Sequence, residues 1–186
     1  MDLLMDSYDV VIAMICSAFN FKYVDLAQGY MSNDDLEWAI QEIGQRCSNI
    51  SRIYSIGKSV NGFPLWVIEI SDKPGEEETE PAFKEIIGFI GNVHGDEPVG
   101  RELLIFLANW LCDNHLKDPL ATLIVENVHL HLLPSMNPDG FSLKKRGNAN
   151  NIDLNRDFPD QVVEDALFFC WTWLKNLEKG FDTPFH

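Results

Sequence analysis

The chain has 186 residues, 46% of them hydrophobic, which is enough for one ordinary globular domain with a real core. Its 29 acidic and 14 basic residues give a formal net charge of -15, which argues against a nucleic-acid partner because phosphate binding needs clustered Lys and Arg. No run approaches the roughly 20 apolar residues that a membrane-spanning helix requires.

The N-terminal part of the chain contains one apolar run, residues 10–19. This run resembles the apolar part of a signal peptide, but Asp2, Asp6 and Asp9 precede it where positive charge is expected. We therefore interpret it as a poor secretion signal and assign no role to residues 1–24.

A helix is predicted to begin after Ser32, because Ser32 followed by Asp35 forms a capping-box pattern. Residues 51–57 and 63–71 are strand-like runs joined around Asn61-Gly62, a strong hairpin signal. We expect them to form an antiparallel pair, followed by a solvated acidic loop over residues 73–84.

The next elements are expected to alternate between strand and helix. Residues 85–93 form an apolar run typical of a buried strand, and residues 99–113 carry apolar side chains at helical spacing. Residues 123–133 predict another strand, with His129 and His131 on one face. Two such histidines could bind metal, but we favour hydrogen-bonded strand histidines.

Four cysteines and one glycosylation sequon bear on the compartment. The cysteines show neither a C-x-x-C pair nor zinc-knuckle spacing, so we interpret them as unrelated buried thiols. A secreted protein could pair two of them, but the spacing does not say which. The sequon, Asn49-Ile50-Ser51, is a short pattern that a chain of this length often carries by chance. The four cysteines are Cys16, Cys47, Cys112 and Cys170.

His94 and Glu97 lie between the predicted strand and the predicted helix, with Pro98 near the first helical turn. An imidazole and a carboxylate three positions apart in such a turn can both point into the crevice at the carboxyl end of a sheet. There they can chelate one divalent metal. By itself the His-x-x-Glu pattern is a weak signal.

A second block of residues makes the signal specific. It contains Arg146 and two strings, Leu133-Pro134-Ser135-Met136-Asn137-Pro138-Asp139-Gly140-Phe141 and Asn151-Ile152-Asp153-Leu154-Asn155-Arg156-Asp157-Phe158-Pro159-Asp160. In order and wording these blocks resemble the zinc metallocarboxypeptidases, specifically the carboxypeptidase D/E/N group that trims basic residues from peptide C-termini. The resemblance covers roughly residues 25–161, which would be a partial catalytic domain.

The resemblance implies a zinc ion (Zn2+) held by His94 and Glu97, with Arg146 neutralising the oxyanion of the tetrahedral intermediate. It further implies that Asn155 and Arg156 hold the terminal carboxylate of the peptide substrate. These residue types suit the roles, because a fixed cation stabilises an oxyanion and a guanidinium matches a carboxylate bidentately. Peptide or protein C-termini are thus the expected partners, and a secretory or extracellular location is implied.

The sequence departs from the family's pattern after residue 161. In the family a histidine ligand, a glutamate base, a tyrosine and a specificity residue all follow the Phe158-Pro159-Asp160 block. Here residues 162–186 form a divergent tail, with a short amphipathic helix expected over residues 163–177. His186 ends the chain and is a poor ligand candidate.

Three functional hypotheses follow. The leading one is a zinc metallocarboxypeptidase represented by a truncated or alternatively spliced chain that is weakly active or inactive. The first alternative is a non-catalytic form that binds peptide C-termini, and the second is a zinc hydrolase of acylated amino acids. For the fold, the resemblance implies an α/β architecture, a mixed central β-sheet with helices on both faces, truncated. The alternation of predicted strands and helices agrees with it.

Overall fold

The computed structural model describes residues 29–76 and 85–156, which form one sheet with its flanking helices. The N-terminal run at residues 10–19, most of the acidic loop and the predicted tail helix lie outside these residues. No helix in the described part is long and apolar enough to cross a membrane. The elements are α2 (Asn33–Arg46), β1 (Ser51–Lys58), β2 (Pro64–Ile70), β3 (Glu85–Ile90), α3 (Val99–Asn114), α4 (Pro119–Asn127), β4 (Val128–Leu133), α5 (Pro138–Leu143) and the 3-10 turn η2 (Leu154–Arg156).

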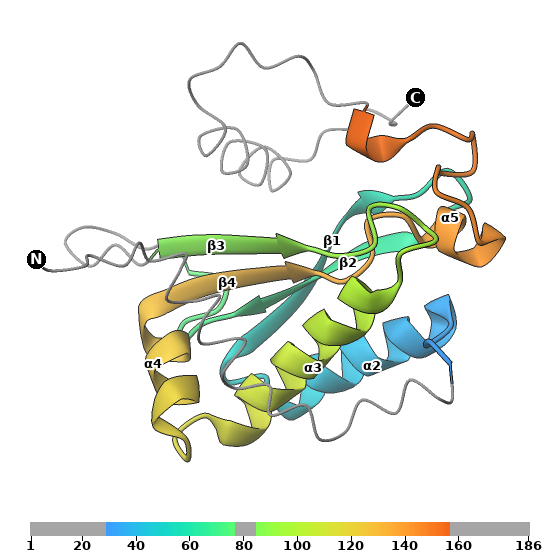
Figure 1. Ribbon diagram of the computed structural model, residues 1–186. Coiled ribbons are helices and arrows are strands. Elements are labelled where there is room, and N and C mark those ends of the chain that lie inside the picture. The colour runs from blue at the N-terminus through green and yellow to red at the C-terminus, as the bar shows by residue number, and fades with distance from the viewer. Residues whose placement is uncertain (1–28, 77–84, 157–186) are drawn as a thin grey trace, which may run out of the picture. The chain divides into compact units, whose positions relative to one another are not determined.

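The sheet is mixed and has the strand order β1-β2-β4-β3 (Figure 1). Strands β1 and β2 form the predicted antiparallel hairpin, in which Gly62 takes a φ of 89° that favours glycine. Strand β4 pairs antiparallel with β2 and parallel with β3. Because β3 and β4 run in the same direction, the segments that follow them emerge at the same end of the sheet.

Helices α2 and α3 lie side by side against one face of the sheet (Figure 1). The capping box of α2 is confirmed, since the Ser32 hydroxyl and the Asp35 side chain bond each other's backbone N–H. Both helices bury an apolar stripe against inward-facing strand residues. The core includes Ile40, Ile43, Leu111, Ile68 and Leu132, none more than 1% exposed. This α/β arrangement around a mixed sheet confirms the expected fold class.

The predicted strand over residues 123–133 is wrong in its first half. Residues up to Asn127 belong to helix α4, and β4 begins only at Val128. The helix starts because the Asp118 side chain accepts from the N–H groups of Leu120 and Ala121 while Pro119 occupies the first turn. The apolar run continued across the boundary because α4 buries its inner face and β4 is buried as well.

The interpretation of the cysteines as unrelated thiols is wrong for two of them. Cys47 and Cys112 form a disulfide with a Cα–Cα distance of 5.7 Å across 65 positions of sequence. Cys47 is the C-cap of α2 and Cys112 lies near the end of α3, so the packing of the two helices brings them together. Cys16 and Cys170 lie outside the described residues.

The two histidines of β4 are hydrogen-bonded as expected. Their rings stack at 5.0 Å on one face of the strand, and each has a partner on another strand of the sheet: β2 for His129 and β1 for His131. His129 Nε2 lies 2.6 Å from Glu69 Oε1, and the Tyr54 hydroxyl lies 3.0 Å from His131 Nδ1. Burial lowers the pKa of His131 to about 4, against the raising effect of Glu69 and with smaller lowering effects of His129 and Arg52.

Acidification should therefore destabilise the fold. Unfolded His131 takes up a proton near pH 6.5 and folded His131 only near pH 4, so the unfolded state binds more protons between these values. Neutral His131 therefore contributes to the free energy of unfolding above pH 6.5, and this contribution is lost as the pH falls. The loss by pH 5 is roughly 2 kcal/mol. Urea unfolding at pH 7 and pH 5 measures it. His131→Asn should flatten this dependence and His115→Asn should not; equal slopes in both variants would contradict the assignment.

Candidate active site

The turn that carries the predicted ligands runs from β3 to α3, beside the segment that follows β4. Backbone hydrogen bonds join the two segments: Gly91 N–H donates to Leu133 O, Met136 N–H to Gly91 O, and Asn137 N–H to Asn92 O, at 2.8 to 3.0 Å. The candidate site thus lies at the carboxyl ends of two parallel strands, a common place for binding sites in α/β sheets.

Buried amides hold the shape of this turn. Asn92 adopts a left-handed φ of 51°, and its side-chain Nδ2 donates to the carbonyl of His94 at 2.8 Å. The Ser135 hydroxyl donates to Asn92 Oδ1 at 2.9 Å. Asn137, only 1% exposed, donates to the carbonyls of Val93 and Arg146. Because each buried amide has partners, the backbone around His94 has little freedom to move.

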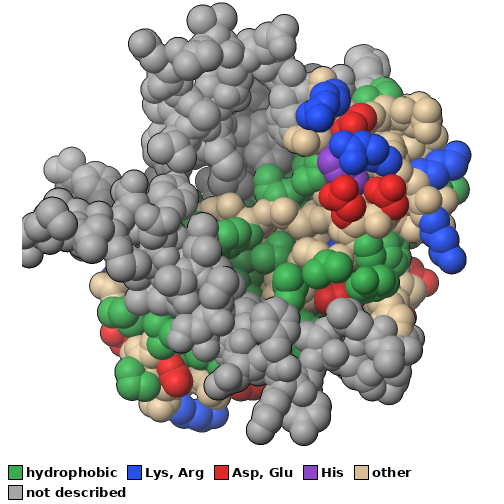
Figure 2. Space-filling model, in the orientation of Figure 1, with side chains coloured by type: hydrophobic (Ala, Val, Ile, Leu, Met, Phe, Trp, Pro, Cys, Tyr) green, Lys and Arg blue, Asp and Glu red, His purple; other side chains and the backbone are tan. Residues whose placement is uncertain are grey.

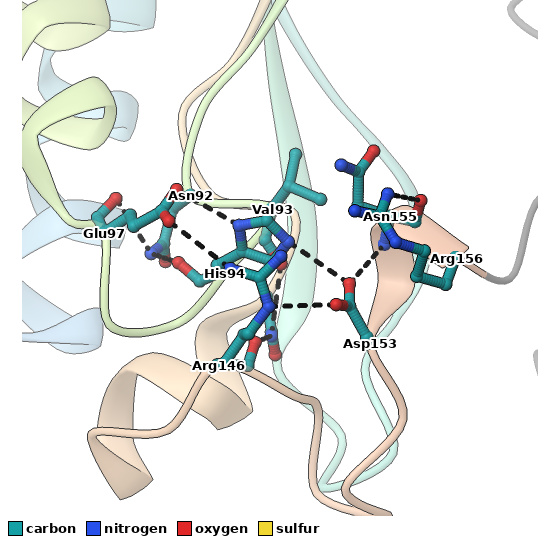
Figure 3. Close-up of polar contacts among 9 residues, drawn as sticks. Asn92, Val93, His94, Glu97, Arg146, Asp153, Asn155 and Arg156 are labelled. Carbon is teal, nitrogen blue, oxygen red and sulfur yellow. Dashed lines mark hydrogen bonds and ion pairs between the residues drawn. The ribbon is translucent and has the colours of Figure 1, made fainter.

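His94 and Glu97 point toward one another, as Figure 3 shows. His94 is 8% exposed, and its Nδ1 lies 3.1 Å from Glu97 Oε2. The other ring nitrogen, Nε2, lies 3.2 Å from Asp153 Oδ1. A proton on Nε2 donated to Asp153 leaves a lone pair on Nδ1, on the side that faces Glu97.

Asp153 joins the predicted residues and was not singled out from the sequence. Besides His94, it accepts from Arg146 Nε at 2.9 Å and from the Asn155 N–H at 3.0 Å. Partial desolvation raises the pKa of Asp153, but these hydrogen bonds and the Arg146 charge outweigh it, and the pKa is lowered. The signal available in the sequence was its place two residues before Asn155, within an already noted string.

The structure brings Arg146 next to Glu97 and His94, whereas Asn155 and Arg156 lie further away. Arg146 Nη1 lies 3.6 Å from Glu97 Oε1, so this guanidinium contacts both the Glu97 and the Asp153 carboxylates. Asn155 and Arg156 lie in η2, on the far side of Asp153 from Glu97 in Figure 3. They join the group through the Asn155 backbone, and Arg156 Nη1 donates to the Asn155 carbonyl at 3.2 Å.

Arg101 is a second residue that the sequence did not reveal. This arginine is 0% exposed, and burial lowers its pKa to about 10, against the smaller raising effect of Glu102. It donates to Ser135 Oγ and Asn33 Oδ1 and to two backbone carbonyls of residues 31 and 32, and its guanidinium lies 3.8 Å from the centre of the Phe141 ring. Through Ser135 it supports Asn92 and hence the turn.

The donor set around His94 fits part of a zinc site. Two ligands of a tetrahedral zinc, each about 2.0 to 2.2 Å from the ion, lie roughly 3.3 to 3.5 Å apart. The 3.1 Å between His94 Nδ1 and Glu97 Oε2 is close to that separation. Asp153 occupies the position of the outer carboxylate that orients a metal-bound histidine. Across residues 29–76 and 85–156, no cluster of three or more His, Cys, Asp or Glu side chains could hold a metal ion.

The surroundings of this site are charged. On the face shown in Figure 2, basic and acidic side chains gather around a histidine at the end of the molecule where β3 and β4 end. The acidic members of the site, Glu97 and Asp153, lie within 4 Å of the Arg146 guanidinium. The site is therefore a polar, partly open surface whose buried component is His94.

Comparison with known proteins identifies the family. The model of the zinc carboxypeptidase family matches residues 36–168, which is more than half of the chain. The chain belongs to the zinc carboxypeptidase family. This is a family of metallopeptidases, and its name implies zinc.

Two relatives illustrate how much of a longer protein is represented. Carboxypeptidase SOL1 of Arabidopsis thaliana is 74% identical over 138 residues, which are 74% of this chain and 27% of the relative. Human carboxypeptidase D is 48% identical over 140 residues, which are 70% of this chain and 10% of the relative. The chain thus spans about a quarter or less of the length of these two relatives.

The fold is shared with solved carboxypeptidases. The crystal structure of a metallo-carboxypeptidase from Burkholderia cenocepacia superimposes with a TM-score of 0.58 at 24% identity. The match covers 70% of this chain and 34% of that structure. At this identity the match establishes the zinc carboxypeptidase fold for the described residues.

Proposed function

We propose that this chain provides one part of the active site of a zinc-dependent carboxypeptidase that releases residues from peptide C-termini. The observation that carries the proposal is the arrangement of His94, with Nδ1 at 3.1 Å from Glu97 and Nε2 at 3.2 Å from Asp153. His94 and Glu97 would be two protein ligands of the ion. A bound zinc ion would supply a water with a pKa near 7 and polarise the scissile carbonyl.

The remaining residues would bind and orient the substrate. Asp153 would accept a hydrogen bond from the Nε2–H group of His94, which keeps the proton on Nε2 and leaves the Nδ1 lone pair on the Glu97 side. Arg146 would donate to the carbonyl oxygen as negative charge develops there. Loss of one such donor typically costs about 2.7 to 4 kcal/mol of transition-state stabilisation. Holding Arg146 by two carboxylates supports this role, because a fixed donor needs no reorganisation during reaction.

Asn155 and Arg156 would recognise the free carboxylate that marks the end of a peptide. Arg156 is exposed, and among the described residues its guanidinium donates only from Nη1 to a backbone carbonyl, which leaves other N–H groups of its fork for a ligand. A preference for Lys or Arg at the substrate C-terminus is part of the proposal and rests on the family resemblance. A secretory or extracellular location is supported by the Cys47–Cys112 disulfide, since disulfides persist in oxidising compartments.

Zinc titration of the purified chain should detect a site that depends on the Glu97 carboxylate. We expect Glu97→Gln to abolish zinc binding, because one of the two described ligands loses its charge. Asp153→Asn should weaken binding about 10- to 100-fold, the usual effect of removing the outer partner of a ligating histidine. Calorimetry with zinc in a non-chelating buffer measures both effects.

Asp96→Asn is the matched control, because Asp96 is exposed in the same turn and loses the same charge. It should bind zinc like the unchanged chain. Equal affinities of the Glu97→Gln and Asp96→Asn variants would overturn the ligand assignment.

Binding of a peptide with a free C-terminus should depend on Arg156. We expect amidation of the peptide C-terminus, or Arg156→Ala, to reduce affinity at least tenfold, because a charge-assisted bidentate pair is lost. Lys145→Ala, at an exposed lysine, is the control and should leave binding unchanged. Fluorescence anisotropy of labelled peptides measures the affinities. Binding without hydrolysis would favour the non-catalytic alternative. Equal affinity for the free and the amidated peptide would exclude recognition of the terminal carboxylate by Asn155 and Arg156.

A further inference from the structure

The sequon Asn49-Ile50-Ser51 lies in the turn that connects α2 to β1. Asn49 is exposed, whereas the two residues that follow it are buried: Ile50 is 3% exposed and Ser51 is 5% exposed. The asparagine is therefore the member of the sequon that projects into solvent.

The geometry of the turn explains this division. The N–H groups of Ile50 and Ser51 both donate to the Cys47 carbonyl at 2.9 Å, and the Ser51 hydroxyl donates to the same carbonyl at 3.0 Å. These bonds close a tight turn around Ser48 and Asn49 and direct Ile50 into the core. Among the described residues, the Asn49 amide has no side-chain hydrogen bond to lose on modification.

A second observation concerns the compartment in which this turn forms. Cys47, two positions before Asn49, is joined to Cys112 by a disulfide. Structural disulfides form where the environment is oxidising, as in the lumen of the secretory pathway. That lumen is also where Asn-x-Ser/Thr sites are glycosylated. The exposed acceptor makes the modification sterically possible, and the disulfide independently indicates the compartment in which it takes place.

We infer that Asn49 carries an N-linked oligosaccharide. The donor required is an oligosaccharide attached through a pyrophosphate to a lipid. In the transfer, the bond between the first sugar's anomeric carbon and the phosphate oxygen breaks, and a bond from that carbon to Asn49 Nδ2 forms. Nδ2 loses one proton, the lipid pyrophosphate leaves, and no oxidant or reductant is needed.

The buried serine sets the order of events. In the folded chain the Ser51 hydroxyl is bonded to the Cys47 carbonyl, and Ser51 pairs with Ile70 in the hairpin. Recognition of the sequon hydroxyl therefore precedes formation of this turn. The disulfide allows that order, because its second cysteine is synthesised 65 residues after the first.

A glycan at Asn49 would leave the candidate active site free. Ser51, the first residue of β1, pairs with Ile70, which pairs with Leu130 in β4. Asn49 lies two residues before Ser51, near the end of the sheet where β4 begins. The candidate site follows Ile90 and Leu133, at the opposite end of β3 and β4 (Figure 1). The glycan would instead cover the α2–β1 turn beside the disulfide.

Mass spectrometry of the full-length protein, isolated from eukaryotic cells that secrete it, tests the inference. Digestion with a peptide N-glycosidase in heavy-oxygen water should convert Asn49 to labelled aspartate and lower the apparent mass of the protein in one step. Asn49→Gln should remove this step. Ser51→Thr should keep it, since threonine retains the sequon, and Asn150→Gln at another exposed asparagine should keep it as well.

The state of the cysteines in the same digest makes a negative result decisive. An unmodified Asn49 in protein whose Cys47 and Cys112 are joined would overturn the inference directly. Reduced cysteines together with an unmodified Asn49 would overturn its premise about the compartment. Neither result would affect the zinc and peptide tests of the proposed function.

Discussion

Gly95→Ala should unfold or displace the turn that carries His94. A Cβ atom at Gly95 would lie 2.0 Å from the Gly140 carbonyl carbon and 2.4 Å from the Phe141 nitrogen. Both are backbone atoms in the middle of α5, and neither can rotate away as a side chain would. Gly95 N–H also donates to the Arg146 carbonyl at 3.2 Å, so a shift of this turn would move Arg146 as well.

The expected loss is at least about 3 kcal/mol of unfolding free energy, because overpacking against rigid neighbours is costly. Zinc affinity should fall with it, since His94 and Glu97 flank the displaced backbone. Chemical denaturation and zinc titration of the same variant measure the two effects.

Gly62→Ala provides the comparison. A Cβ at Gly62 meets no atom within 4 Å, so the only cost is its φ of 89°, about 1 to 2 kcal/mol. Zinc affinity should be unchanged in this variant. If Gly95→Ala loses no more unfolding free energy than Gly62→Ala, the Gly95 turn does not approach helix α5 as closely as described.

Removal of the Cys47–Cys112 disulfide should be the second large effect. The bond closes a loop of 65 positions, for which loop-closure entropy predicts about 4 kcal/mol and measured values are typically about 2 to 4 kcal/mol. The double variant Cys47→Ala, Cys112→Ala should lose this amount. Arg46, which bonds Asp113 and Asn109, would remain as the exposed link between α2 and α3.

Unfolding with and without a thiol reductant distinguishes the effect of losing the disulfide from the effect of replacing the two cysteine side chains. The unchanged chain should lose stability in reductant, and the double variant should not respond. If reductant leaves the unfolding midpoint of the unchanged chain where it was, the disulfide does not contribute to the folded state.

Local patterns in the sequence predicted several features correctly. The hairpin around Asn61-Gly62 and the capping box at Ser32 depend on backbone conformations that a few adjacent residues select. The placement of His94 and Glu97 between a strand and a helix followed from the change of apolar period between residues 85–93 and residues 99–113. These predictions held because neighbours in sequence set the local geometry.

The boundary between α4 and β4 could not be read from the apolar pattern. Both elements are buried, so the run from Leu123 to Leu133 is apolar in helix and strand alike. The decisive signal is the helix cap, in which Asp118 is the N-cap and Pro119 occupies the first turn. A cap of this kind outweighs strand propensity because it satisfies helix N–H groups directly.

Residue types at fixed local spacing were sufficient to predict the family, the type of fold and the residues proposed to bind metal and substrate. Which distant residues meet could be seen only once the chain was folded. The disulfide joins Cys47 to Cys112 across 65 positions, and the hydrogen bond joins His94 to Asp153 across 59. The burial of Arg101 encloses a charge between several elements. Such contacts follow from the packing of helices and loops around the sheet, which no local pattern specifies.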